Sequence, residues 1–179
     1  MKKNKINLVL FLAEKETFLV KNFILNFKKF EKFINFKLII CSKKTAKLIK
    51  RKKSSLKIIT NDKRNTHQIL KNLNKMNLEK KNLYGLSLQF PWIIKERVLN
   101  KFNFIMNCHF GRIPEYKGHN TISHAILNNE KNIWGSIHKM KKKVDAAVII
   151  KEIKVKHNLF NVREIEKKLS LLFLKSLLI

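Results

Sequence analysis

The chain has 179 residues, two cysteines and a formal net charge of +28, and it contains no apolar run of about 18 residues that would span a membrane as a helix. This length indicates one domain, which we expect to cover residues 1–179, and neither Cys41 nor Cys108 stands in a metal-type or redox-type spacing. The charge permits an anionic partner, but it comes from 35 Lys and only 5 Arg, and Lys, Asn, Ile and Phe have codons rich in A and T. A biased genome therefore explains the charge without selection for nucleic acid.

The first sixteen residues, MKKNKINLVLFLAEKE, imitate a secretory signal peptide with a basic segment and an apolar run. They contain no small-residue cleavage site, and charged residues follow the apolar run at once. We therefore predict that residues 6–13 form the first strand of a cytoplasmic protein that has no membrane segment. Two free thiols in a chain of this size are also typical of a reducing compartment.

Short apolar runs then alternate with stretches whose apolar residues recur at three- and four-residue spacing. The predicted strands are 6–13, 36–42, 55–60, 82–90, 103–109, 133–140 and 146–155, and the predicted helices are 16–33, 43–52, 66–76, 92–102, 121–129 and 161–179. This alternation, with strands that are apolar throughout, predicts an α/β fold: a Rossmann-like, mostly parallel sheet with helices on both faces. Ligands of such folds bind beyond the carboxyl ends of the strands.

The strand at 103–109 ends in the sequence Asn107-Cys108-His109, which contains two side chains that can take part in catalysis. Residues two apart on a strand share a face, so the amide of Asn107 and the imidazole of His109 would lie side by side, with Cys108 turned into the core. An amide can donate to a developing oxyanion, and an imidazole can transfer a proton near neutral pH. Asp145 is one of only two aspartates, and it precedes an apolar strand from which its carboxylate can orient an imidazole.

The ordered set of motifs resembles the folate-dependent formyltransferases, which include glycinamide ribonucleotide transformylase, methionyl-tRNA formyltransferase and the sugar N-formyltransferases. The pattern of that family is N-x-H, a loop ending L-P-x-x-x-G, a helix, G-x-T/S-x-H, and the Asp of D-x-G-x-I/V-I. The matching residues here are Asn107, His109, Ile113, Pro114, Gly118, Ser136, His138 and Asp145, and Gly135 stands directly before Ser136, one position later than the Gly of the pattern. The resemblance is strongest over residues 83–155, and it implies the formyltransferase fold.

The resemblance implies transfer of a formyl group from 10-formyltetrahydrofolate to a primary amine, without a metal. Asn107 and protonated His109 would stabilise the tetrahedral oxyanion, and Asp145 would hold the imidazole. A role for His109 as the base on the amine is the alternative, and the sequence leaves both open. By the same analogy four residues after the fourth strand would line the folate pocket, namely Phe90, Pro91, Trp92 and Ile93. Trp92 alone is equally typical of a residue that packs a helix.

Departures from the family pattern bear on the acceptor. Ala147 stands at the D-x-G position, the loop reads H-F-G-R-I-P, and the first strand lacks the Gly-rich phosphate turn of the glycinamide enzyme. Because PWII, PEYKGHN and SHAILN are most similar to the sugar branch, we predict a nucleotide-linked amino sugar as the acceptor. Methionyl-tRNA is the alternative, favoured by the basic charge and disfavoured by the lack of an additional tRNA-binding domain after the last helix. A degenerate domain that binds folate or a partner without turnover, or a nucleic-acid-binding module, would also fit the sequence.

Overall fold

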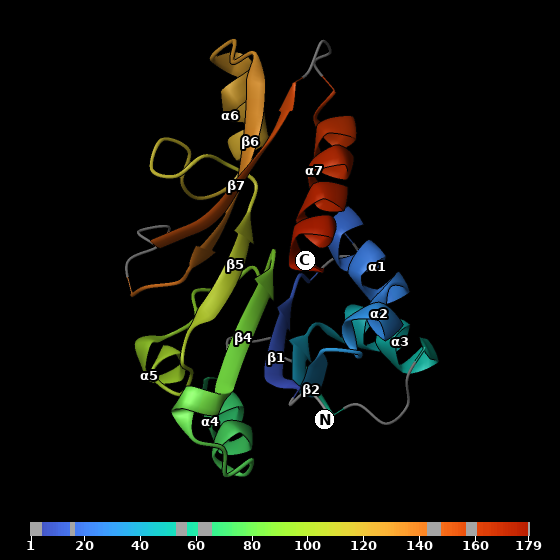
Figure 1. Ribbon diagram of the computed structural model, residues 1–179, viewed down its shortest axis with the longest axis vertical. Coiled ribbons are helices and arrows are strands. Elements are labelled where there is room, and N and C mark those ends of the chain that lie inside the picture. The colour runs from blue at the N-terminus through green and yellow to red at the C-terminus, as the bar shows by residue number, and fades with distance from the viewer. Residues whose placement is uncertain are drawn as a thin grey trace.

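The computed structural model describes residues 5–14, 17–52, 57–60, 66–142, 148–156 and 161–178. Its centre is a seven-stranded sheet with the strand order β3-β2-β1-β4-β5-β6-β7 (Figure 1). The strands are β1 (Ile6–Leu12), β2 (Ile34–Cys41), β3 (Ile58–Thr60), β4 (Leu83–Leu88), β5 (Ile105–His109), β6 (Asn132–Lys139) and β7 (Val148–Lys156). The first five strands are parallel, whereas β6 runs antiparallel to both of its neighbours. The predicted mostly parallel α/β sheet is thus confirmed.

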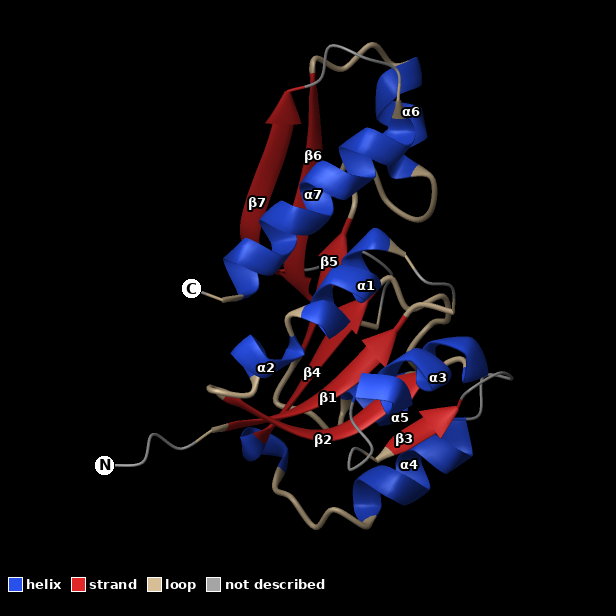
Figure 2. Ribbon diagram, turned by 90° about the vertical axis from the view of Figure 1, so that its right-hand side faces the viewer, coloured by secondary structure: helices blue, strands red, loops and turns tan. Residues whose placement is uncertain are grey.

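Helices cover both faces of this sheet, as predicted. They are α1 (Phe18–Leu25), α2 (Phe27–Phe30), α3 (Lys43–Lys52), α4 (Thr66–Asn74), α5 (Glu96–Leu99), α6 (Thr121–Leu127) and α7 (Val162–Leu177), with one turn of 3₁₀ helix at Lys80–Asn82. Helices α1, α2, α3 and α7 lie on one side of the sheet, and α4 and α5 lie on the other (Figure 1). Figure 2 shows α7 and α1 crossing in front of the strands.

The central strand β1 shows why the sheet needs two layers of helices. Leu8 and Leu10 belong to the apolar cluster that contains α1 and α7, while Val9 and Phe11 belong to the cluster that contains α4 and α5. All four side chains are buried. A strand that is apolar on both faces is stable only when both faces are covered, as in parallel α/β sheets.

Two predicted helices differ from the structure. The helix predicted over 16–33 is divided at Asn26 into α1 and α2, and the side-chain amide of Asn26 donates to the carbonyl oxygen of Asn22 at 2.9 Å. Such side-chain bonds to the backbone compete with helix continuation. The helix predicted over 92–102 is a single turn, α5, because residues 92–95 are not helical and Lys95 has extended backbone. The polypeptide after β4 therefore forms a loop at the carboxyl end of the sheet.

Candidate active site

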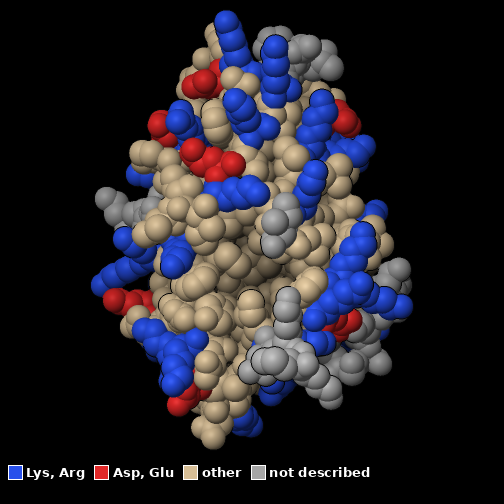
Figure 3. Space-filling model, viewed as in Figure 1, with Lys and Arg blue, Asp and Glu red and all other residues tan. Residues whose placement is uncertain are grey.

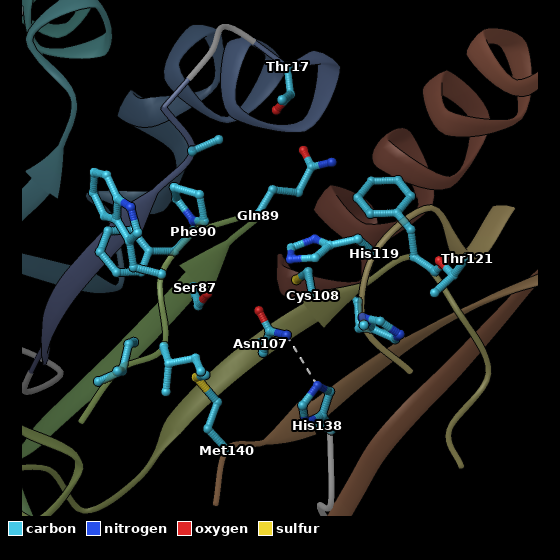
Figure 4. Close-up of a pocket in the computed structure, with 18 of the residues that line it drawn as sticks. Thr17, Ser87, Gln89, Phe90, Asn107, Cys108, His119, Thr121, His138 and Met140 are labelled. Carbon is cyan, nitrogen blue, oxygen red and sulfur yellow. Dashed lines mark hydrogen bonds between the residues drawn. The ribbon is translucent and has the colours of Figure 1, made fainter. Parts of the chain in front are cut away.

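A row of polar side chains crosses three neighbouring strands of the sheet. Ser87 of β4 pairs with Asn107 of β5, and Asn107 pairs with His138 of the antiparallel strand β6. The Asn107 side-chain nitrogen lies 3.2 Å from Nε2 of His138, and both side chains point into the same pocket (Figure 4). Ser87 and His138 are buried. Buried polar groups that line up in this way are costly to fold unless they bond to one another or to a ligand.

These side chains line a cavity of about 650 Å³ at the carboxyl ends of the parallel strands. Phe90 and Met140 border it on one side, Thr17 and Gln89 lie across from Met140, and Thr121 closes it from α6 (Figure 4). The volume lies within the range of roughly 300–1,000 Å³ that is usual for small-molecule sites. The structure therefore offers a ligand site where α/β sheets generally place one.

His109 lies at the end of β5, is buried, and also lines the cavity. Its ring stands edge-on to that of His138 with the centroids 6.2 Å apart, and its Nε2 lies 2.7 Å from the carbonyl oxygen of Tyr116. The structure thus brings Asn107 and His109 to one cavity. Between them, Cys108 packs into the apolar core, and burial raises the pKa of its thiol. A thiol in that state is a packing group and not a nucleophile.

The third predicted catalytic residue, Asp145, lies outside the residues that the structure describes, and so does Ala147. The described chain stops at Lys142, which lines the cavity, and resumes at Val148 in β7. The role of Asp145 is thus still a prediction from the motif.

All four predicted folate-binding residues, Phe90 to Ile93, line the cavity. The Trp92 ring packs edge-on against that of Phe90 at a centroid distance of 5.2 Å, and Phe90 in turn packs against Phe11 of the core. Trp92 precedes α5 and is not part of a helix, whereas Ile93 is 65% exposed. Together they form an apolar, partly aromatic wall that can accept a flat heterocycle.

Two polar features of the cavity were not predicted as site residues. His138 was recognised only as the last residue of the G-x-T/S-x-H motif, and that motif is the signal that identifies it. Gln89 has a backbone φ of 54°, which is unusual for a residue other than glycine, and its Nε2 lies 3.3 Å from Oε1 of Glu166 in α7. No sequence pattern signals such a backbone. Strained residues of this kind are often found at functional sites.

The surface charge and the potential metal ligands of the described residues say little more about the kind of ligand that the cavity binds. Lys and Arg side chains are spread over the face in Figure 3, and the hollowed centre of that face is mainly uncharged. No helix among the described residues is long and apolar enough to cross a membrane. In the same part of the chain, no group of three or more His, Cys, Asp or Glu side chains is placed to hold a metal ion.

Several solved structures superpose on this chain over nearly its whole length. A glycinamide ribonucleotide transformylase from Symbiobacterium toebii superposes with a TM-score of 0.76 at 12% identity, covering 96% of this chain and 85% of that one. A formyltetrahydrofolate deformylase from Pseudomonas syringae pv. tomato gives 0.77 at 14% identity, covering 99% and 62%. The chain has the formyltransferase fold. A second transformylase, from Geobacillus kaustophilus, agrees with a TM-score of 0.76 at 17% identity over 98% of this chain and all of the other.

A curated sequence supports the same resemblance. The methionyl-tRNA formyltransferase of Mycoplasmopsis pulmonis is 35% identical over 76 residues, which is 42% of this chain and 26% of that protein. The chain thus matches about a quarter of that relative's length. No family model matches the sequence. The predicted resemblance to the formyltransferases is confirmed by the curated match and the structures together.

Proposed function

We propose that this chain transfers a formyl group from 10-formyltetrahydrofolate to a primary amine. The observation that carries the proposal is the convergence of Asn107, His109 and His138 in one cavity beside the aromatic wall of Phe90 and Trp92. An amide, two imidazoles and an apolar wall are the groups needed to hold a pterin, polarise a formyl oxygen and move a proton.

In the proposed reaction the neutral amine attacks the formyl carbon, and a new C–N bond forms as the formyl oxygen becomes an oxyanion. Asn107 has two amide hydrogens; one points to His138, so the other can donate to the oxyanion. Collapse of the tetrahedral species breaks the bond from carbon to N10 of the folate, and the proton lost by the amine ends on N10. His109 is the group proposed to relay that proton or to stabilise the oxyanion in its protonated form, and the carboxylate of Asp145 is proposed to help shuttle the proton.

For the acceptor we propose an amino sugar carried by a nucleotide. Besides the loop sequences that favour the sugar branch, the cavity wall includes Glu14, Thr17 and Asn120, whose side chains suit sugar hydroxyl groups. A second candidate is methionyl-tRNA, because the curated match is to an enzyme of that name and the chain has a net charge of +28. Both acceptors present a primary amine to the same carbon.

Release of tetrahydrofolate from 10-formyltetrahydrofolate tests the proposal, with nucleotide-linked amino sugars, charged methionyl-tRNA and glycinamide ribonucleotide as separate acceptors. We expect acceptor-dependent release that falls about 100-fold or more in His109→Ala and in Asp145→Asn. His67→Ala is the matched control, since His67 is exposed on α4 and does not line the cavity. Near-normal turnover in His109→Ala would remove the proposed mechanism, and folate binding without release would favour a non-catalytic domain.

The two acceptors differ in their response to salt. Neutralisation of tRNA phosphates by lysines releases counterions, so the KM for methionyl-tRNA should rise steeply between about 50 and 200 mM salt. A nucleotide sugar makes few phosphate contacts, and its KM should change little over the same range.

A further inference from the structure

His109 is fixed by a contact that its proposed catalytic role does not explain. Its Nε2 lies 2.7 Å from the carbonyl oxygen of Tyr116. A carbonyl oxygen only accepts hydrogen bonds, so Nε2 must carry a hydrogen for this contact to be favourable. This condition holds in the neutral ring and in the imidazolium alike. Nδ1 is therefore the nitrogen that gains and loses the proton.

Tyr116 is itself anchored through its side chain. Its hydroxyl donates to Oε1 of Glu130 at 3.0 Å and accepts from Nδ2 of Asn128 at 3.1 Å. Asn128 is the C-cap of α6, and Glu130 follows two residues later. The backbone N–H of Tyr116 also donates to the carbonyl of Arg112 at 2.7 Å. The carbonyl that His109 contacts thus belongs to a residue held at both its ring and its backbone.

The polypeptide between His109 and Tyr116 is packed closely around this bond. A Cβ atom at Gly111 would lie 2.6 Å from the Tyr116 oxygen and 2.8 Å from Nε2 of His109. The carbonyl of Gly111 accepts from the hydroxyl of Ser136 at 2.7 Å, and the hydroxyl of Thr121 donates to the carbonyl of Phe110. These two hydrogen bonds hold the loop to β6 and α6 around the contact between His109 and Tyr116. The Tyr116 carbonyl therefore has little room to move away from the imidazole.

We propose that Tyr116 is a positioning residue for His109. The anchored phenol holds the Tyr116 carbonyl against Nε2, and this fixes both the orientation of the ring and the nitrogen at which the proton is exchanged. The catalytic consequence rests on the proposed function, whereas the position of the hydrogen on the ring does not.

The test uses the full chain labelled with ¹⁵N in its histidines. Long-range ¹H–¹⁵N correlation spectra show which ring nitrogen carries hydrogen, and His109→Gln assigns the signal. We expect Nε2–H for His109 in the wild type and a loss of that single pattern in Tyr116→Phe. In the same variant kcat should fall on the order of 10- to 100-fold, because the His109 ring is misplaced. The KM for the folate should be unchanged, because the substrate is still bound in its place.

The chain has a matched control in its other tyrosine. The hydroxyl of Tyr84 accepts from Nδ2 of Asn103 at 3.0 Å and does not line the cavity, so Tyr84→Phe removes a comparable bond and should leave the His109 spectrum and kcat unchanged. Should Tyr116→Phe fail to fold, Glu130→Ala tests the same anchor from an exposed position. Glu130→Gln keeps an acceptor oxygen and should restore the wild-type spectrum.

Each result is decisive. An Nδ1–H tautomer for His109 in the wild type would overturn the proposal, and so would a wild-type spectrum with wild-type kcat in Tyr116→Phe. If the wild-type chain transfers formyl to none of the acceptors, the proposed function fails, but the spectra still decide whether Tyr116 fixes the ring.

Discussion

Replacement of Gly111 by Ala tests how tightly the site depends on its loop. The added Cβ would lie 2.6 Å from the Tyr116 carbonyl oxygen, 2.8 Å from Nε2 of His109 and 3.0 Å from Cβ of Thr121. The nearest of these atoms is backbone, which cannot rotate away as the end of a long side chain can. The methyl group would therefore push apart the two atoms of the hydrogen bond that holds the His109 imidazole.

The added methyl group should lower both the free energy of unfolding and kcat. Forcing one extra methyl into a closely packed site costs typically about 1–3 kcal/mol. For a domain of this size, each kcal/mol lowers Tm by about 2–4 °C. A displaced imidazole adds a kinetic loss, which we expect to be on the order of 100-fold in kcat. The variant should thus be both less stable and, where still folded, nearly inactive.

Urea unfolding and formyl transfer, measured on the same samples, separate the two effects. Gly85→Ala is the control, because its Cβ would meet only side-chain atoms of Ile105, at 2.8 and 2.9 Å, in the core between β4 and β5. That variant should lose stability of a similar size but keep its turnover per folded molecule. Wild-type stability and wild-type turnover in Gly111→Ala would refute the packing argument, and equal loss of turnover in both variants would refute its specificity.

Three further predictions concern the cavity and the core. Asn107→Ala should lower kcat on the order of 100- to 1,000-fold, as loss of an oxyanion donor does, and equilibrium titration should show unchanged folate binding. Trp92→Ala should raise the KM for the folate roughly 10-fold, which corresponds to about 1.4 kcal/mol of lost aromatic contact, while kcat is kept. Because burial raises the pKa of Cys108, its contribution to stability is present below the unfolded pKa of about 8.5 and is lost as the pH rises beyond it, by up to about 1.4 kcal/mol per pH unit. Urea unfolding between pH 8 and about pH 10 should show this decline, and Cys108→Ala should flatten it.

Local hydrophobic patterns were enough to predict the architecture, because strands that are apolar on both faces, such as β1, have to be covered on both sides. The ends of the helices were harder to predict from the sequence. The apolar spacing of residues 16–33 continues through Asn26, yet the helix is divided there, where the Asn26 side chain bonds to the backbone of Asn22. The stretch 92–102 contains helix-type spacing, but residues 92–94 line a cavity instead. In both places the backbone departs from the helix although the apolar spacing continues, so periodicity alone does not locate the helix end.

One part of the candidate site could likewise be predicted from local sequence, and another part depends on how distant segments of the chain pack together. Asn107 and His109 were predicted because two residues at the end of one strand share a face, which is a property of the strand alone. The pairing of Asn107 with His138 depends on β6 running antiparallel to β5 and on its register. A slip of one residue would place Ile137 or Lys139 opposite Asn107 and turn the imidazole to the other face of the sheet. The bond from His109 to Tyr116 depends likewise on how α6 holds the loop. The sequence thus indicates which groups take part, but only the fold brings the second histidine and the loop carbonyl to them.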